Sequence, residues 1–138
     1  MKSKAPLALA EQIIMMLVFA VAAAVCLSVF VHCDAAAREN RARDFAALEA
    51  QNAAEVLKAC RGDVSAAAGN YGGADSGEVW DIYYDESGNM TADADAEYHL
   101  CAEVSRGGAG LPGSADVSVT RSGEPVFSMR VCWQEVAA

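Results

Sequence analysis

Histidine and cysteine are the residues of this chain best suited to chemistry, yet their spacing fits neither a catalytic nor a metal site. The chain has two histidines, His32 and His99, and five cysteines, and no Cys-x-x-Cys pair of the kind that zinc sites use occurs in it. A nucleophilic triad would have to use His99, and no Gly-x-Ser-x-Gly motif lies near that residue. We therefore predict a protein that is not an enzyme and that has no cofactor and no metal site.

Three cysteines, Cys60, Cys101 and Cys132, lie beyond the apolar N-terminal region, an odd number for a disulfide framework. Strand alternation places Cys101 and Cys132 on the same side, away from the apolar face. In a simple meander they would be two strand spacings apart, about 10 Å, whereas a disulfide needs Cα atoms within about 7 Å. We expect free thiols, because a bridge could form only if these two strands were neighbours.

An acidic loop could offer oxygen ligands to calcium. It runs from Asp85 to Asn89 and continues with Asp93, Asp95 and Glu97. The loop lacks the order of an EF-hand, and Gly88-Asn89 suits a hairpin turn. We interpret it as a solvated loop.

Glu11 has the most unusual position of the ionisable residues, because it stands just ahead of an uncharged apolar run from Ile13 to Val31. An ionisable group at the edge of an apolar helix must either reach the lipid headgroups or meet a cationic partner. A carboxylate in the first turn of a helix also suits the helix dipole.

The apolar run has the length of a membrane-spanning helix. Its 19 residues would extend about 28 Å as a helix, close to the roughly 30 Å hydrocarbon thickness of a bilayer. We predict a basic tip at residues 1–6 and a transmembrane helix at residues 7–33. Because Lys2 and Lys4 precede the span, the positive-inside rule puts the N-terminus in the cytoplasm and the rest outside the cell membrane. The alternative is a cleaved secretory signal, with release after Ala37, but the run exceeds the 7–15 residues of a signal.

The remainder of the chain is one small acidic domain. The formal net charge of the whole chain is −9, and from Asp34 onward it is −10. A domain this acidic lacks the basic surface that binds a phosphate backbone, so we exclude nucleic acid as a partner.

Helix-forming residues continue past the span. Residues 34–62 predict an amphipathic continuation, so that one helix runs from near Leu7 to Cys60 and stops at Arg61-Gly62. Asp63 would cap a short second helix, Val64 to Ala68. The predicted apolar stripe of the continuation consists of Phe45, Leu48, Ala53, Val56, Leu57 and Cys60.

The period then changes to that of strands, after a Gly-rich connection from Gly69 to Gly77. Residues 63–138 predict a strand-rich domain whose four-stranded antiparallel sheet covers the helix, which gives an α+β fold. Arg121 to Glu124 fits a hairpin turn between the last two strands. The four predicted strands are Val79–Asp85, Glu97–Ser105, Ala115–Thr120 and Val126–Trp133.

The segment from Leu7 to Glu11 and the order of elements after it resemble the type IV pilin and type II secretion pseudopilin superfamily. In that family a short basic leader precedes an apolar helix that carries a Glu at its fifth mature position, and Glu11 has that spacing if Leu7 is the first mature residue. The resemblance implies that Glu11 pairs with the N-terminal amine of a neighbouring subunit. The family has Gly before the processing site, where this chain has Pro6.

The resemblance predicts a pilin-like fold and a minor pilin or pseudopilin-like subunit of an envelope filament or a type II secretion-like apparatus. Its partners would be the membrane and other pilin-like subunits, contacted through the N-terminal helix. If Pro6 keeps the leader uncut, Leu7 has no free amine. The alternative is then a single-pass, membrane-tethered extracytoplasmic binding or sensory domain that does not assemble.

Overall fold

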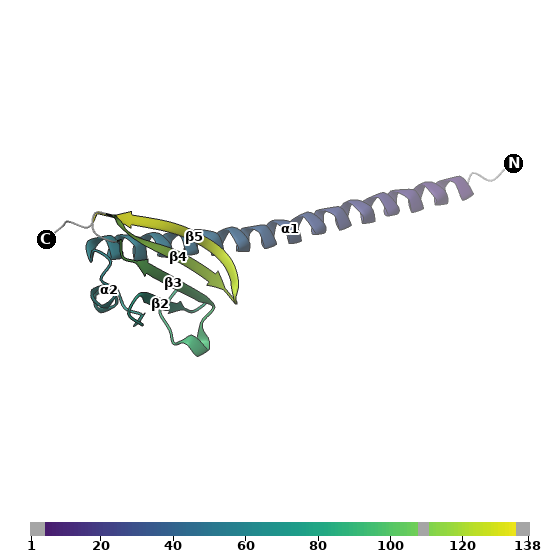
Figure 1. Cartoon of the computed structure of the whole chain (residues 1–138). Coiled ribbons are helices and arrows are strands. Elements are labelled where there is room, and N and C mark those ends of the chain that lie inside the picture. The colour runs from purple at the N-terminus through teal and green to yellow at the C-terminus, as the bar shows by residue number, and fades with distance from the viewer. Residues whose placement is uncertain (1–4, 108–110, 135–138) are drawn as a thin grey trace. The chain divides into compact units, whose positions relative to one another are not determined.

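The computed structural model describes residues 5–107 and 111–134 and has an α+β architecture. Two helices come first, α1 (Ala5–Ala59) and α2 (Val64–Tyr71), and a 3-10 helix, η1 (Asp93–Asp95), separates the second strand from the third (Figure 1). The chain divides into two compact units, residues 1–40 and residues 41–138. The five strands are β1 (Ala74–Asp75), β2 (Val79–Tyr84), β3 (Tyr98–Ser105), β4 (Gly113–Arg121) and β5 (Glu124–Trp133).

The first unit contains the apolar part of α1. Its large apolar side chains, from Leu7 to Val31, are all exposed. Among the described residues, α1 is the one helix whose length and composition would allow it to cross a membrane, with a mean hydropathy of 2.9 in its most apolar window. Charged residues return after this part, and Asp34 and Arg38 form an ion pair of 2.9 Å one turn apart. The predicted long helix is therefore confirmed, and it remains a candidate for a membrane span.

The second unit contains an antiparallel sheet in which every strand pairs with its neighbours in sequence, in the order β1-β2-β3-β4-β5. The prediction of four strands was wrong by one, because β1 lies inside the predicted Gly-rich connection. Gly72 and Gly73 have positive φ values of 107° and 97°, which glycine adopts readily. They turn the chain back so that Ala74 and Asp75 pair with β2.

The last part of α1 packs against the apolar face of the sheet. The helix contributes mostly alanines, whereas the large buried side chains Trp80, Ile82 and Leu100 come from the strands. Small side chains on the helix leave the space between helix and sheet to the large side chains of the strands. The buried positions of the helix are Ala42, Ala46, Ala50, Ala53, Ala54 and Leu57.

The predicted apolar stripe was wrong at Leu48, which is 55% exposed. A residue two positions from Ala46 and Ala50 lies on the opposite side of a helix with 3.6 residues per turn, so Leu48 cannot share their face. Phe45 and Val56 were placed correctly, because both pack at the margin of the core.

Helix α1 ends at the predicted stop. The amide of Gly62 donates to the carbonyl of Leu57 (2.8 Å), and that of Arg61 donates to the carbonyl of Lys58 (3.1 Å). With Arg61 at φ 53°, this pattern is a Schellman motif. Asp63 then caps α2, as predicted, by accepting from the amide of Ala66 at 3.1 Å. The second helix is longer than predicted, because it continues through Gly69 to Tyr71.

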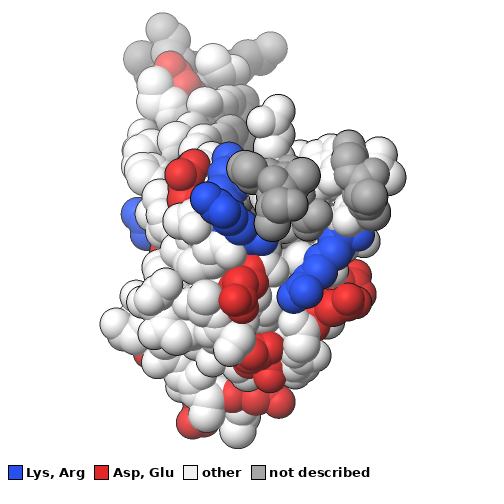
Figure 2. Space-filling view, turned by 60° about the vertical axis from the view of Figure 1, so that its left-hand side comes forward, with Lys and Arg blue, Asp and Glu red and all other residues white. Residues whose placement is uncertain are grey.

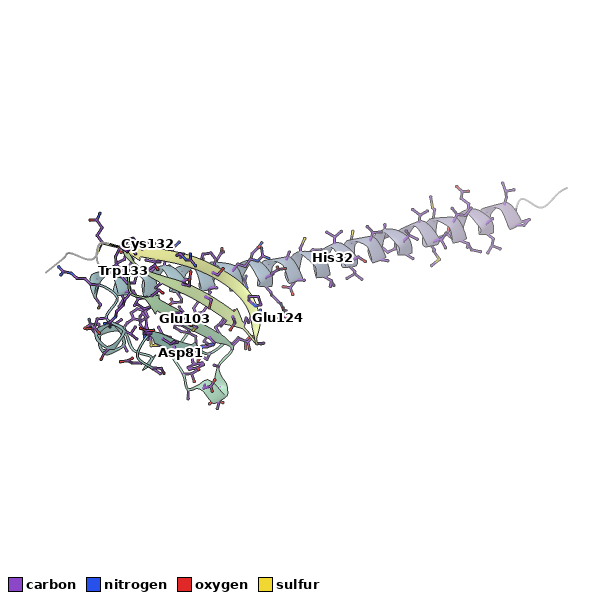
Figure 3. The ribbon with its side chains drawn as sticks, viewed as in Figure 1. His32, Asp81, Glu103, Glu124, Cys132 and Trp133 are labelled. Carbon is purple, nitrogen blue, oxygen red and sulfur yellow. The ribbon has the colours of Figure 1, made fainter. Side chains whose placement is uncertain are left out.

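Two glycines make a slot for Trp133 near the end of β5. A Cβ atom on either Gly62 or Gly113 would collide with the indole ring. The ring therefore packs directly on the backbone where α1 ends and where β4 begins. Figure 3 shows Trp133 next to Cys132 at this end of the strand.

The predicted hairpin turn between β4 and β5 is confirmed. Its two central residues, Ser122 and Gly123, have φ values of 48° and 84°, as in the tight turns that suit antiparallel strands. The register shifts between Val119 and Thr120, which places Pro125 opposite Thr120 near the start of β5.

All five cysteines are free. Cys101 lies on β3 and Cys132 on β5, and β4 separates the two strands. This is the meander arrangement in which the sequence predicts no bridge between them.

Candidate functional site

The predicted assembly residue, Glu11, is exposed in the second turn of α1. The expectation that it lies in the first turn was wrong, because the helix already begins at Ala5. The favourable effect of a helix dipole on a carboxylate is largely confined to the first turn, so a dipole contribution is weak here. Glu11 is also the only Asp, Glu, Lys or Arg in the described sequence ahead of Asp34.

The predicted processing position, between Pro6 and Leu7, lies within the first turn of α1. Proline is tolerated there because its missing N–H would have no intrahelical acceptor. The side chain of Leu7 is 79% exposed. Lys2 and Lys4, on which the predicted orientation rests, lie outside the described residues.

A second candidate site occupies the face of the sheet that points away from α1. Alternation along β2 and β3 puts Asp81, Tyr83, His99 and Cys101 on this face, and the strand register places Asp81 opposite Cys101 and Tyr83 opposite His99. Nε2 of His99 lies 2.8 Å from Oδ1 of Asp81. The rings of Tyr83 and His99 stack with centroids 4.6 Å apart and planes 9° apart. Figure 3 labels Asp81 on β2.

This group does not form an activated nucleophile. The pKa of the Cys101 thiol is raised to about 11. Burial is the largest cause, followed by the charge of Asp81 and a hydrogen bond to it. Cys101 is therefore a protonated thiol at neutral pH. The imidazole of His99 is directed to the carboxylate of Asp81, and the thiolate that a Cys-His mechanism requires is not favoured.

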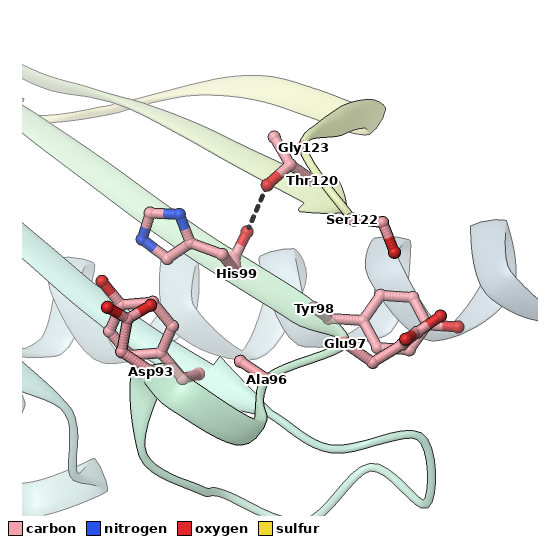
Figure 4. A pocket seen from close by; sticks show the side chains of 9 residues that line it. Asp93, Ala96, Glu97, Tyr98, His99, Thr120, Ser122 and Gly123 are labelled. Atoms are coloured by element: carbon pink, nitrogen blue, oxygen red, sulfur yellow. Dashed lines mark hydrogen bonds between the residues drawn. The ribbon is translucent and has the colours of Figure 1, made fainter.

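A hollow of about 230 Å³ lies beside His99 (Figure 4). The Thr120 hydroxyl donates to the carbonyl of His99 at 3.5 Å, which is the dashed line in the figure. Glu97 is held by Arg121, whose Nε donates to Oε1 at 2.8 Å. The hollow is lined by Tyr83, Asp93, Ala96, Glu97, Tyr98, His99, Thr120, Ser122 and Gly123.

The chain segment that supplies six of the nine lining residues is strongly acidic. Between Arg61 and Arg106 the sequence contains ten Asp and Glu residues and no Lys or Arg. Figure 2 shows acidic side chains over the lower part of the face in view, and both acidic and basic side chains in its upper part. Burial, followed by the charges of Asp93 and Asp81, raises the pKa of the Tyr83 hydroxyl.

The acidic loop from Asp85 to Asn89 is a tight turn that uses its own carboxylate. Asp85 Oδ1 accepts hydrogen bonds of 2.9 Å from the amides of Ser87 and Asn89. The bond from the Asn89 amide is the largest cause of the lowered pKa of Asp85. Within residues 5–107 and 111–134, no three His, Cys, Asp or Glu side chains converge in a way that could hold a metal ion.

Sequence reasoning missed the grouping of Asp81, Tyr83 and His99. Alternation along β2 puts Asp81 and Tyr83 on the outward face, but it gives no neighbour to His99, which lies on another strand. Both β2 and β3 have polar residues at their outward positions. The pairing of these two strands is the signal that could have revealed the group. The register between β2 and β3 was the missing information.

Comparisons of the chain with protein-family models, with curated proteins and with solved structures found no match.

Proposed function

We propose that this chain is a minor pilin or pseudopilin-like structural subunit of an envelope filament or a type II secretion-like apparatus. The observation that supports this best is α1 itself. It is one unbroken helix. Its first part exposes apolar side chains and has a single carboxylate, Glu11, and its last part packs against an antiparallel sheet.

In this proposal the bilayer surrounds the first part of α1 before assembly. The N-terminus is cytoplasmic and the sheet domain is extracytoplasmic, as the lysines ahead of the helix favour. During assembly, the helices of neighbouring subunits replace lipid around the apolar side chains. The small side chains of Ala20 and of Ala22 to Ala24 allow helices to approach closely.

Glu11 provides the specific contact of the proposed assembly. A lone carboxylate on an apolar helix is costly to bury without a partner. The N-terminal amine of a neighbouring subunit would neutralise it, provided that cleavage before Leu7 has freed that amine. Subunits that are out of register would leave Glu11 unpaired, so the same contact would also select the register.

The first experiment is intact-mass analysis of the protein purified from its native membrane. A mass that matches a chain beginning at Leu7, with or without one methyl group, would support the proposal. The full-length mass would contradict the pairing of Glu11 with an amine. A chain that begins near Arg38 would show that the apolar segment is a secretory signal.

A second experiment tests assembly directly through a Glu11→Gln variant expressed in the native host. We expect chemical cross-linking to give a ladder of multimers for the wild type and mainly monomer for this variant. Glu55→Gln is the matched control, because Glu55 is an exposed glutamate of the same helix, 79% accessible, beyond the apolar part. Equal ladders for Glu11→Gln and the wild type would argue against the proposed contact.

The alternative function is that of a membrane-tethered binding or sensory domain that does not assemble. Pro6, at the position where the pilin family has Gly, favours this alternative. A full-length mass together with an absence of cross-linked multimers would support it.

A further inference from the structure

The hollow beside His99 has the size for one side chain. Its volume of about 230 Å³ is below the roughly 300 Å³ at which pockets for drug-sized ligands begin. It lies at the end of the outward face, so a molecule that entered it would also meet the polar side chains of that face. Ser118 and Ser128 are opposite one another on this face, on β4 and β5.

The chemistry of the lining favours a cation. The carboxylate of Asp93 makes no hydrogen bond or ion pair within the described part of the chain. Glu97 adds a second carboxylate, and its charge is partly balanced by Arg121. The hydroxyl oxygens of Thr120 and Ser122 can accept hydrogen bonds from a ligand. An ammonium or guanidinium group supplies both the charge and the donors that this set lacks.

The negative charge of the segment that supplies most of the lining restricts the source of that cation. With no Lys or Arg between Arg61 and Arg106, this part of the domain attracts basic partners over distances of about a Debye length. The same charge repels the corresponding face of a second copy. A basic polypeptide therefore fits better than self-association through this surface.

We propose that the hollow receives a lysine or arginine side chain from a basic segment of a partner protein, and that Asp93 is the carboxylate that pairs with it. The rest of the segment lies along the polar outward face, where the side chains of β3 and β4 offer hydrogen bonds to its main chain. This partner would be the same whether the chain assembles into a filament or remains a lone tethered domain.

The test uses the full-length protein in detergent micelles and a tri-lysine peptide with blocked termini. Binding is followed at low salt by titration calorimetry and by the amide resonances of His99 and Thr120. We expect the peptide with free ε-amines to bind and to shift both resonances. The same peptide with acetylated ε-amines should not bind, because it has lost the charge.

The matched variants are Asp93→Asn and Asp95→Asn, which change the same charge two residues apart on η1. Asp93 lines the hollow and Asp95 does not. We expect Asp93→Asn to weaken tri-lysine binding about fivefold, the size of one exposed charge pair, and Asp95→Asn to weaken it by less than about twofold.

Four results would overturn the proposal. Equal losses in the two variants would mean diffuse attraction without a site, and acetylated peptide that binds as well would exclude recognition of the cation. No binding of tri-lysine would exclude the site itself. Spermine that displaces tri-lysine from the hollow and binds more tightly would identify a small polyamine, and not a protein segment, as the occupant.

Discussion

The hydroxyl of Tyr84 donates a hydrogen bond of 2.8 Å to Oε2 of Glu49, which joins β2 to α1 across 35 positions of sequence. The hydroxyl of Tyr71 donates to the same oxygen, also at 2.8 Å, and Nδ2 of Asn52 donates to Oε1 at 3.3 Å. One half-buried carboxylate therefore fixes α1 to both α2 and β2.

Replacement of Glu49 should destabilise the domain. Glu49→Ala leaves two phenol hydroxyls in a partly buried position without their acceptor, and we expect the free energy of unfolding to fall by about 1–3 kcal/mol. Urea titration of the full-length protein in micelles, followed by tryptophan fluorescence, would measure the loss. Glu55→Ala is the control, because Glu55 is exposed on the same helix. Similar losses in both variants would show that the contacts with the tyrosines contribute little.

The same cluster predicts a loss of stability at high pH. Burial, followed by the hydrogen bond and the charge of Glu49, raises the pKa of Tyr84 well above its ordinary value, and burial raises that of Tyr71. A tyrosine whose pKa is raised by folding stabilises the protein fully below its unfolded pKa of about 10. That stability is lost as the pH rises above about 10. Melting temperatures between pH 8 and pH 12 should fall less steeply for Tyr84→Phe than for the wild type.

Cys101 should react slowly with thiol reagents. With a pKa of about 11, only about one thiol in a thousand is ionised at pH 8. Timed labelling with iodoacetamide, read by peptide mass spectrometry, should modify the exposed Cys132 long before Cys101. Asp81→Asn should speed the labelling of Cys101, because it removes a negative charge beside the thiol, and Asp95→Asn should not. Labelling of Cys101 at the rate of Cys132 would contradict the assignment.

Gly113 should not tolerate a side chain. A methyl group at this position would meet the indole of Trp133, and we expect Gly113→Ala to destabilise the domain by about 1–3 kcal/mol. Gly69 is the matched control, because it lies in α2 with no atom near the position of a Cβ. Gly69→Ala should raise the melting temperature, since alanine favours helix over glycine by up to about 1 kcal/mol. If both variants melted alike, the slot for Trp133 would not be tight.

The long helix and the four longer strands could be predicted from sequence because each repeats its pattern over many residues. The alternation of Trp80, Ile82 and Tyr84, for example, marks one face of β2, and all three are buried. The strand β1 could not be predicted, because two residues are too few to show a period.

The helical face in contact with the sheet was harder to predict than the helix itself. Hydrophobicity favoured Leu48, whereas the structure buries a row of alanines on the opposite side of the helix. The site on the outward face was missed for a different reason. The contact between Asp81 and His99 depends on the register of two strands, which no pattern within either strand contains.

The meander of the sheet has a consequence for how the domain folds. Each strand pairs only with the strand before or after it in the chain, so the sheet can grow hairpin by hairpin. Local pairing of this kind lowers the contact order and speeds folding. The long-range steps are those that bring α1 to the sheet, such as the contact between Glu49 and Tyr84. We therefore expect the docking of α1 onto the sheet to limit the rate of folding. The helix is synthesised first, whereas the sheet is complete only when β5 has been made.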